Sequence, residues 1–387
     1  MANDNRAGRF IRSDSGYQAF MPMKLPPVPP IRMDAEMTNL LSIADRKLGR
    51  LDGITQVLPN PELFVTMYVK KEALLSSQIE GTQASFAEVL NAEHDINQER
   101  KDVREVVNYV DAMSWGLEEL DRFPLSLRLI RNIHKRLLKN TRGSQRSPGE
   151  FRTTQNWIGP PGCTIATATF VPPTVPDMQQ AMGDLELFMH EQDDIPALIK
   201  IALIHAQFET IHPFLDGNGR MGRLLITFWL CQQQILTKPL LYLSYYFKMH
   251  RSEYYDRLMD VRKKGDWESW IKFFLCGIAE VSDEATTSAK EILRMKEDFS
   301  KKLYQLGGNS GHYQLLLEKL FEHPYVSRSE VMTLLGVSNP TAGNIIEAFC
   351  NHGILTDMDS GKTRGKTYGF QDYLRILEKG TETERFL

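Results

Sequence analysis

The stretch HPFLDGNGRMGR, from His212 to Arg223, decides the fold because it lies between two apolar helical patterns. The first pattern covers about 194–210 and the second about 220–235. Pro213 should end the first helix near His212, because a proline ring cannot continue a helix. The Gly217-Asn218-Gly219 sequence is typical of a tight turn that tolerates positive φ. The stretch therefore predicts a sharp turn between two buried helices, the second of which begins at the glycines.

The same turn has the chemistry of an anion site. A helix that begins at Gly217–Gly219 leaves backbone N–H groups free, and its dipole adds partial positive charge. Arg220 and Arg223 are three residues apart, so both reach the same side and suit a polyphosphate. Asp216 would repel a bare phosphate but can hold a Mg²⁺ that bridges phosphate oxygens. His212 stands at the rim as the nearby group suited to general-base work.

Two simpler interpretations explain parts of the stretch. Asp-Gly-Asn-Gly is also an ordinary helix-to-helix turn, in which Arg220 and Arg223 are solvated and His212 caps the preceding helix. A zinc site from His212 and Asp216 is a weaker competitor, because no third ligand lies at typical spacing. The combination of all these residue types between two apolar helices favours the phosphate site.

Composition is that of an ordinary globular protein. The chain has 387 residues, 42% of them hydrophobic and 25% charged, which predicts two or three domains. A net charge of -3 gives no overall electrostatic case for nucleic-acid or membrane binding. No apolar run approaches the roughly 20 residues that span a bilayer, and the N-terminus lacks an apolar signal core. The cysteines form no CxxC pair and are expected to be free thiols in a reducing, cytoplasmic compartment: Cys163, Cys231, Cys276 and Cys350.

The patterning divides the chain into four parts. We expect an extended Pro-rich arm at 1–33, a helical N-terminal domain at 34–110, a catalytic core at 111–290 and a C-terminal module at 308–387. Pro61 should open a helix that runs towards Ile79. The segment 157–171 breaks the helical trend, since it is rich in Gly, Thr and β-branched residues, and predicts an inserted β-hairpin. The other helices are expected at about 34–51, 102–120, 126–139, 176–191, 251–262 and 267–290.

The C-terminal module follows a glycine-rich linker at 307–311. Helices are expected at about 312–322, 327–335 and 340–351, with Ser327 and Glu330 spaced as a capping box, and two short strands should flank 359–361. That order resembles a winged helix-turn-helix. Lys362, Arg364 and Lys366 are a modest basic cluster that favours DNA phosphates, whereas the helix at 340–351 has no Lys or Arg and contains Glu347. DNA binding and a dimerisation or protein-docking role both stay open.

The stretch 212–223 matches the Fic family signature, HxFx(D/E)GNGRxxR, at every defined position, and the resemblance runs from about 34 to 285. It implies a mainly α-helical core that transfers AMP from ATP to Ser, Thr or Tyr hydroxyls of target proteins and of itself. By this resemblance His212 deprotonates the target hydroxyl and Asp216 ligates Mg²⁺. The implied ATP-phosphate contacts are Gly217, Asn218, Gly219, Arg220 and Arg223.

The resemblance also covers the segments around the signature. The hairpin at 157–171 resembles the Fic flap, which pairs with the target chain as a strand; an exposed strand edge accepts many sequences. Its docking residues would be Thr167, Ala168, Thr169, Phe170 and Val171. Tyr254 and Tyr255 resemble a tyrosine pair near the adenine, although core packing is an equal alternative. Some relatives carry an asparagine about seven residues further on, where this chain has Arg262.

A second motif lies before the signature. Glu80 is expected at the C-terminal end of a helix, where the dipole disfavours a carboxylate unless a cation lies nearby. Ser76, Glu80 and Gly81 resemble the Fic inhibitory motif, (S/T)xxxE(G/N). The resemblance implies that Glu80 pairs with Arg223 and occupies the γ-phosphate contact. The alternative is an exposed glutamate before a helix-ending glycine.

Other functions remain to be weighed against AMP transfer. A DNA-binding regulator that senses ATP would need no base, so the intact His212 argues against it. The same fold can transfer phosphocholine, UMP or a phosphate, or can remove AMP with Glu80 positioning a water. The partners expected are ATP, a target protein and a second copy of this chain in a homodimer.

Overall fold

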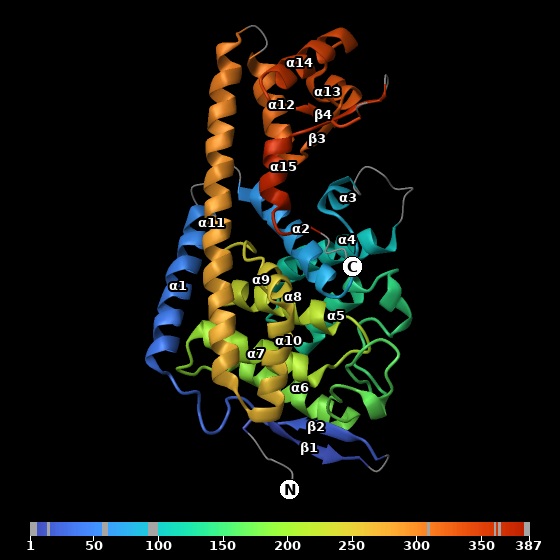
Figure 1. Ribbon diagram of the computed structural model, residues 1–387, viewed down its shortest axis with the longest axis vertical. Helices are drawn as coiled ribbons and strands as arrows, with labels where there is room; N and C mark the ends of the chain where they lie inside the picture. The colour runs from blue at the N-terminus through green and yellow to red at the C-terminus, as the bar shows by residue number, and fades with distance from the viewer. Residues whose placement is uncertain are drawn as a thin grey trace.

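The computed structural model describes residues 6–13, 16–55, 61–91, 100–307, 310–359, 361–362 and 365–382. As predicted, the chain is mainly α-helical (Figure 1). The core helices are α1 (Ala35–Thr55), α2 (Pro61–Ile79), α3 (Phe86–Asn91), α4 (Lys101–Leu120), α5 (Leu127–Leu137), α6 (Val175–His190), α7 (Ala197–Ile211), α8 (Asn218–Gln232), α9 (Ser244–Met249), α10 (Arg251–Lys264) and α11 (Trp267–Gln305).

The centre of the core is the pair α7 and α8. Nearly every side chain of both helices is buried, as expected for helices that are apolar on all sides. They contact each other, and α2, α4, α5, α6, α10 and α11 pack around them. The turn between them therefore lies among several helices, with Phe214, Asn218 and Arg220 buried and Asp216 partly exposed.

The longest helix, α11, runs well past the end expected at about 290. Its buried side continues through Ile292, Phe299 and Leu303, and no proline or glycine occurs between Lys290 and Gly307. α11 packs along α1 in the core and along α12 beyond it. It thus joins the two parts of the molecule, as Figure 1 shows.

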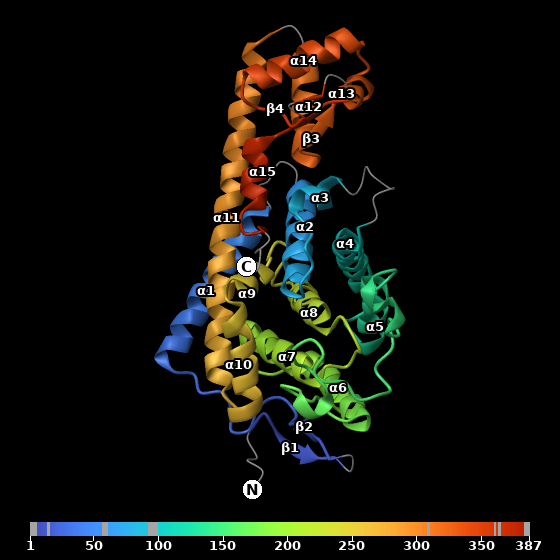
Figure 2. The same ribbon diagram turned by 45° about the vertical axis from the view of Figure 1, so that its right-hand side comes forward.

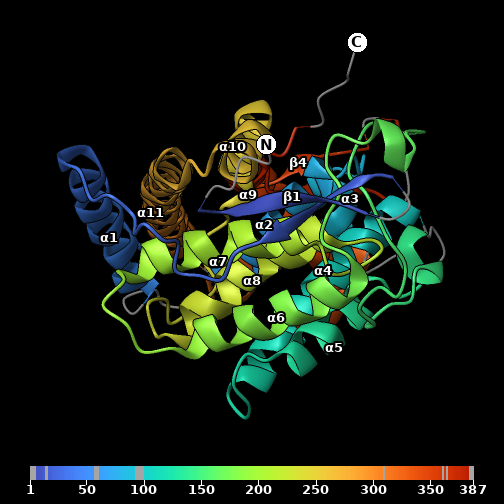
Figure 3. The same ribbon diagram turned by 90° about the horizontal axis from the view of Figure 1, so that it is seen from below.

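The described residues of the N-terminal arm form a two-stranded antiparallel hairpin. β1 (Gly8–Arg12) pairs with β2 (Gln18–Pro22), with Phe10 opposite Phe20. Figure 3 shows this hairpin crossing the end of the molecule beside α7. The side chain of Gln207 donates to the carbonyl of Met23 at 2.8 Å and ties the arm to α7. The sequence pattern missed these strands because the prolines that follow them dominate the local composition.

The predicted hairpin at 157–171 is much shorter than expected. Its only strand pairing is one antiparallel bridge between Ile158 and Phe170, and a 3₁₀ turn covers Ile165–Thr167. The hydroxyl of Thr167 accepts from the backbone N–H of Thr164 at 3.1 Å. Such side-chain bonds compete with a strand ladder, which explains why the Thr-rich tip folds as a loop.

The C-terminal module contains α12 (Ser310–Glu322), β3 (Tyr325–Ser327), α13 (Arg328–Leu335), α14 (Asn339–Asn351), β4 (Thr356–Asp357), β5 (Thr367–Gly369) and α15 (Gln371–Glu378). The strands form an antiparallel sheet in the order β3-β5-β4, and β3 was not predicted. The capping box of Ser327 and Glu330 is confirmed. The winged-helix prediction rests on this element order. The parts of the linker at 308–309 and of the wing at Ser360 and Arg364 lie outside the described residues.

The module then returns towards the core. α15 packs against α11 and α2, and Figure 2 shows it between those two helices. This return places the last described residues beside the end of α2, which carries the second motif. Over the described residues, the model contains no helix with both the length and the apolar character needed to cross a membrane.

Candidate active site

The turn after α7 is held by the side chain of Asn218. Its Oδ1 accepts from the Phe214 N–H at 2.9 Å, and its Nδ2 donates to the Phe214 carbonyl at 2.8 Å. His212 ends α7 in the left-handed region, with φ 51°, a conformation that costs a non-glycine residue roughly 1–2 kcal/mol. Gly217, with φ 77°, starts α8. The side chain of Asn218, proposed from the sequence as a phosphate contact, is thus engaged in shaping the loop.

A histidine outside the signature supports the same loop. His134 on α5 donates from Nε2 to the Asp216 carbonyl at 2.9 Å and accepts at Nδ1 from the Gly149 N–H at 2.9 Å. Its ring stacks on Phe214 with 3.7 Å between centroids. Burial lowers the pKa of His134 to about 4, so the ring is neutral and both nitrogens keep these roles. The amphipathic pattern of α5 was the only sequence signal for a buried residue here.

The two signature arginines differ in their contacts. Arg223 has a side chain only 2% exposed and donates from Nε to Ser76 Oγ at 2.8 Å, and from Nη2 to the Ser76 carbonyl at 2.9 Å. Nη2 also forms an ion pair with Glu80 Oε1 at 2.6 Å. Burial alone would raise the pKa of Glu80, but Arg223 outweighs burial and leaves that pKa lowered. The structure therefore brings the two motifs together in an ion pair between a buried arginine and a partly exposed glutamate.

Glu80 also lies on the glycine turn. A Cβ added at Gly219 would collide with Oε1 of Glu80, so the carboxylate lies directly against the backbone at the start of α8. Gly81 follows with φ 96°, which lets α2 end there. A carboxylate at a helix N-terminus is favoured by the dipole and by the free N–H groups. Glu80 thus sits as an anion in the position expected for a phosphate.

Arg220 is buried and has hydrogen-bonding capacity to spare. Its Nη2 lies 3.6 Å from Asp216 Oδ1 and its Nη1 lies 3.8 Å from Glu105 Oε2, yet Nε and Nη1 have no hydrogen-bond partner among the described residues. Buried guanidinium groups normally bond all their donors, so this site fits an incoming oxyanion. Glu105, on α4, also accepts from Thr82 at 2.8 Å and Arg142 at 3.0 Å, and the sequence had not indicated it.

Asp216 is the residue that fits a cation. Its carboxylate is 40% exposed beside Arg220, where it would meet a metal held by phosphate oxygens. Among the described residues, no group of three His, Cys, Asp or Glu side chains could hold a metal by itself. The zinc alternative therefore gains no support, whereas a Mg²⁺ that shares one carboxylate with phosphates fits the donor set.

His212 has the properties of a base. Its Nδ1 donates to the Glu209 carbonyl at 3.4 Å, which leaves Nε2 with its lone pair. Burial, followed by the charge of Arg262, lowers the pKa of His212 to about 3. The imidazole is therefore neutral near pH 7, the state that accepts a proton.

Two family models cover this part of the chain. Residues 38–118 match the Fic/DOC family N-terminal model and residues 124–230 match the Fic/DOC family model. These two segments of the chain therefore carry a Fic/DOC N-terminal domain and a Fic/DOC domain. A Fic family protein from Desulfovibrio desulfuricans G20 has a similar fold, with a TM-score of 0.58 at 19% identity, over 88% of this chain and 97% of that one.

Curated relatives are similar over a shorter region. Over 151 residues, or 38% of this chain, it is 30% identical to "Protein adenylyltransferase Fic" of Culex quinquefasciatus; over 156 residues, or 40%, it is 28% identical to the protein of the same name from Drosophila grimshawi. These alignments span 27% and 29% of the two relatives. The chain thus covers less than a third of the length of the curated relatives it matches.

The tyrosine pair of this Fic protein divides between core and surface. Tyr254 is 1% exposed, and its hydroxyl donates to His205 Nε2 at 2.9 Å, while His205 Nδ1 donates to the Gly222 carbonyl at 3.0 Å. Tyr255 is 39% exposed and lies 5.1 Å from Tyr254 between ring centroids. Tyr254 is therefore in the core, and Tyr255 is the member of the pair that is accessible to an adenine ring. Arg262 is buried and donates to the Glu209 carbonyl at 2.9 Å.

The segment that resembles the Fic flap is also divided. Thr167 and Thr169 are exposed and Ala168 is half-buried, whereas Phe170 and Val171 are buried. Phe170 bridges to Ile158, and the Val171 carbonyl accepts from the Phe20 N–H at 2.9 Å. Both backbone groups of Phe170 and the carbonyl of Val171 are thus engaged within the chain, and target docking by these two residues stays a prediction. The exposed part, 167–169, remains for that role.

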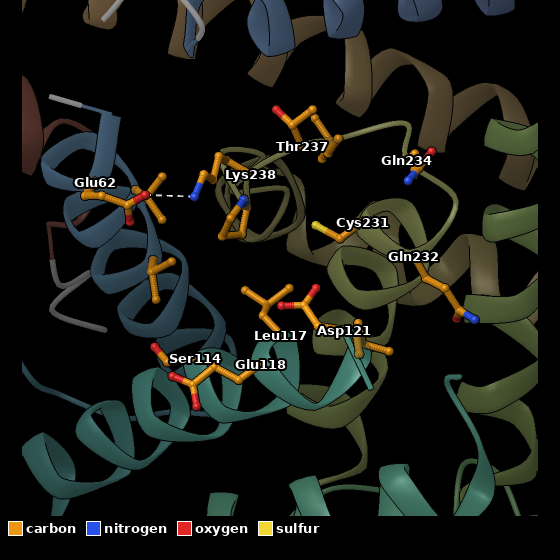
Figure 4. Close-up of a pocket in the computed structure, with 15 residues that line it drawn as sticks. Glu62, Ser114, Leu117, Glu118, Asp121, Cys231, Gln232, Gln234, Thr237 and Lys238 are labelled. Atoms are coloured by element: carbon orange, nitrogen blue, oxygen red, sulfur yellow. Dashed lines mark hydrogen bonds and ion pairs between the residues drawn. The ribbon is translucent and has the colours of Figure 1, made fainter. Parts of the chain in front are cut away.

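A separate cavity of about 950 Å³ lies between α2, α4 and the loop after α8 (Figure 4). Its wall carries the ion pair of Lys238 and Glu62, at 2.8 Å, together with Glu118 and Asp121. Burial raises the pKa of Cys231, also on its wall, to about 12. None of the signature residues lines it, so this cavity is distinct from the site.

Proposed function

We propose that this chain transfers AMP from ATP to Ser, Thr or Tyr hydroxyls of proteins, itself included, and that Glu80 holds it inactive. The observation that carries the proposal is the position of the Glu80 carboxylate, which is paired with Arg223 and pressed against Gly219. An anion is held where the signature predicts a phosphate. The names of the curated relatives support the reaction.

The residues have separable roles in this reaction. Nε2 of His212 takes the proton of the attacking hydroxyl, whose oxygen bonds to the α-phosphorus as the bond to the pyrophosphate group breaks. The N–H groups at the start of α8 and the free donors of Arg220 hold the phosphates. When bound at Asp216, Mg²⁺ neutralises phosphate charge and orients the leaving group.

Inhibition follows from competition for one cation. While Arg223 is bonded to Glu80 and Ser76, it cannot also hold a γ-phosphate, so ATP has no means of aligning its α-phosphorus with His212. A misalignment that raises the barrier by about 2.7 kcal/mol reduces the rate about a hundredfold. The ion pair between Glu80 and Arg223 is therefore sufficient to suppress the basal rate.

The first test is the removal of that contact. Glu80→Gly and Glu80→Gln should both raise auto-labelling and target labelling by labelled ATP and Mg²⁺ by tenfold or more, on the order expected for a freed phosphate contact. Glu62→Gln, on the exposed start of the same helix, is the matched control and should leave labelling unchanged. Equal labelling in all these proteins would sink the inhibition claim.

The second test identifies the base and the donor. His212→Ala in the Glu80→Gly chain should abolish transfer while ATP still binds, as measured by calorimetry. Intact-mass spectrometry of the Glu80→Gly protein should show a gain that matches AMP. A gain that matches UMP, phosphate or phosphocholine would replace the reaction, and loss of AMP from a premodified target would reverse its direction.

A further inference from the structure

The backbone carbonyl of His212 accepts two side-chain hydrogen bonds from outside the signature. Arg152 donates to it from Nε at 3.1 Å, and Asn156 donates from Nδ2 at 3.1 Å. Both donors lie on the segment that leads into the loop at 157–171. Because His212 ends α7 in a left-handed conformation, its carbonyl is not held by the helix, and these two bonds fix its direction.

Arg152 is an unusual residue for mere packing. It is 1% exposed, and among the described residues its hydrogen bonds go to backbone carbonyls: His212, Thr154 at 3.4 Å and Pro173 at 2.5 Å. Its own N–H donates to the Pro213 carbonyl at 2.9 Å. A buried charge that lacks a carboxylate is costly, and burial lowers the pKa of Arg152 to about 10. A neutral side chain would be buried there at a lower free-energy cost, so packing alone does not explain the charge of Arg152.

The same two side chains join His212 to the flap-like segment. Arg152 bonds the Pro173 carbonyl at the end of that segment, and the neighbouring Gln155 bonds the Pro172 carbonyl at 3.0 Å. Asn156 Nδ2 also donates to the Phe214 carbonyl at 2.9 Å, so it spans the turn on both sides of Pro213. A displacement of the segment at 152–173 therefore moves both donors to the His212 carbonyl, Arg152 and Asn156.

We propose that Arg152 and Asn156 are positioning residues that set the orientation of the His212 imidazole and couple it to a target held on residues 167–169. The proposal rests on the proposed role of His212 as the base. Neither residue touches the reacting atoms, so each acts through His212.

The charges around His212 supply a readout that packing alone would not move. Arg152 and Arg262, on α10, both lower the pKa of His212, whereas Glu80 at the end of α2 raises it. Removing the charge of Arg152 should raise the pKa of His212. Since transfer needs the neutral imidazole, the acid limb of the pH–rate profile should then move to higher pH.

The experiment uses the full chain with Glu80→Gly as the active background. Arg152→Gln and Asn156→Ala should lower kcat ten- to a hundredfold with the KM for ATP within twofold, and Arg152→Gln should shift the acid limb upward. Arg152→Lys, which keeps the charge, should leave the acid limb of the pH–rate profile at its parental position. Arg128→Gln, at an exposed arginine on α5, should change neither quantity.

An unchanged kcat in both variants would overturn the positioning role. So would a fall in kcat that parallels a lower Tm and leaves the pH–rate profile unchanged. The outcome is separable from the proposed function. If His212→Ala stays active, the base assignment fails; if His212→Ala is inactive while Arg152→Gln and Asn156→Ala are unaffected, only the positioning role fails.

A different set of contacts links the C-terminus to the inhibitory motif. Gln78, two residues before Glu80, donates from Nε2 to the Thr381 carbonyl at 2.9 Å. Lys248 on α9 donates to Gln78 Oε1 at 2.8 Å, and to the carbonyls of Gly380 at 3.2 Å and Glu382 at 2.7 Å. The ring of Tyr245 leaves no room for a side chain at Gly380. The segment 379–382 thus clamps the end of α2 against α9.

We infer that this clamp stabilises the inhibited state, so that displacing the C-terminal module frees Glu80. This rests on the proposed inhibition. Gly380→Val would collide with Tyr245, whereas Gly353→Val introduces similar strain, since both glycines have positive φ, but in open space. Gly380→Val should raise labelling several-fold, Gly353→Val should not, and Gly380→Val should add nothing in the Glu80→Gly chain. No rise, or a rise that persists in the Glu80→Gly chain, would overturn the inference.

Discussion

Three histidines in or beside the site have a lowered pKa, and burial is the main cause in each. The pKa falls to about 4 for His134 and to about 3 for His205 and His212. Of these, the sequence indicated only His212, because it belongs to the signature. His134, Arg152 and Asn156 bond backbone carbonyls far away in sequence, and no local pattern announces such contacts. The residues of the two motifs could be predicted because their chemistry is local and their spacing is specific.

The neutral His134 should make stability depend on pH. Its pKa is lowered from 6.5 to about 4 on folding, so its contribution is complete above pH 6.5 and is lost as pH falls towards 4. The loss is on the order of 3 kcal/mol. His134→Gln should show a shallower fall of Tm between pH 6.5 and 4 than the parent. The difference between the two proteins isolates His134 from Glu72 and Glu209, whose raised pKa values of about 7 act in the opposite sense. Parallel Tm curves would contradict the assignment.

Elements were easiest to predict where one helix buries its own periodic face. The limits of α2, α4, α7, α8 and α10 lie within a few residues of expectation, because prolines, glycines and apolar spacing mark them. The strands β1, β2 and β3 were not predicted. The hairpin predicted over 157–171 is longer than the single bridge that the structure contains. Short strands depend on partners elsewhere in the chain, here Phe20 beside Val171, which a local pattern does not contain.

The contact between the end of α2 and the start of α8 can be measured by a double-mutant cycle. Gly219→Ala should cost about 1–3 kcal/mol of unfolding free energy, because its methyl group meets Glu80. Most of that loss should be recovered in the Glu80→Gly chain. Gly183→Ala on α6, which has open space, is the control in urea unfolding. An equal loss in both backgrounds would show that Glu80 does not lie against Gly219.

At the scale of the molecule, the first and last described segments both contact the elements that surround the site. The N-terminal hairpin bonds the flap-like segment at Val171, and the C-terminal segment bonds Gln78. The predicted division at 110, 290 and 308 stays a prediction, and α11 continues through the boundary at 290. The described residues of the basic cluster near the wing, Lys362 and Lys366, are paired with Asp359 and Asp357. DNA binding and a dimerisation or protein-docking role both stay predictions for this module.

Nucleotide binding should therefore stabilise the parent and the Glu80→Gly protein to different extents. ATP with Mg²⁺ should raise the Tm of the Glu80→Gly protein by more than that of the parent, because only the former offers Arg223 to the γ-phosphate. ADP, which lacks that phosphate, should raise both Tm values alike. Equal shifts with ATP would mean that Glu80 and the γ-phosphate do not compete.

The length of α11 has a consequence for reach. At about 1.5 Å per residue, its 39 residues span roughly 58 Å as one rod. A protein captured by the C-terminal module would be carried on a spacer of fixed length and not on a floppy tether. Its local concentration at His212 would be high for hydroxyls at the matching distance and close to zero for all others. The length of α11 would then determine which hydroxyl of a captured partner is modified.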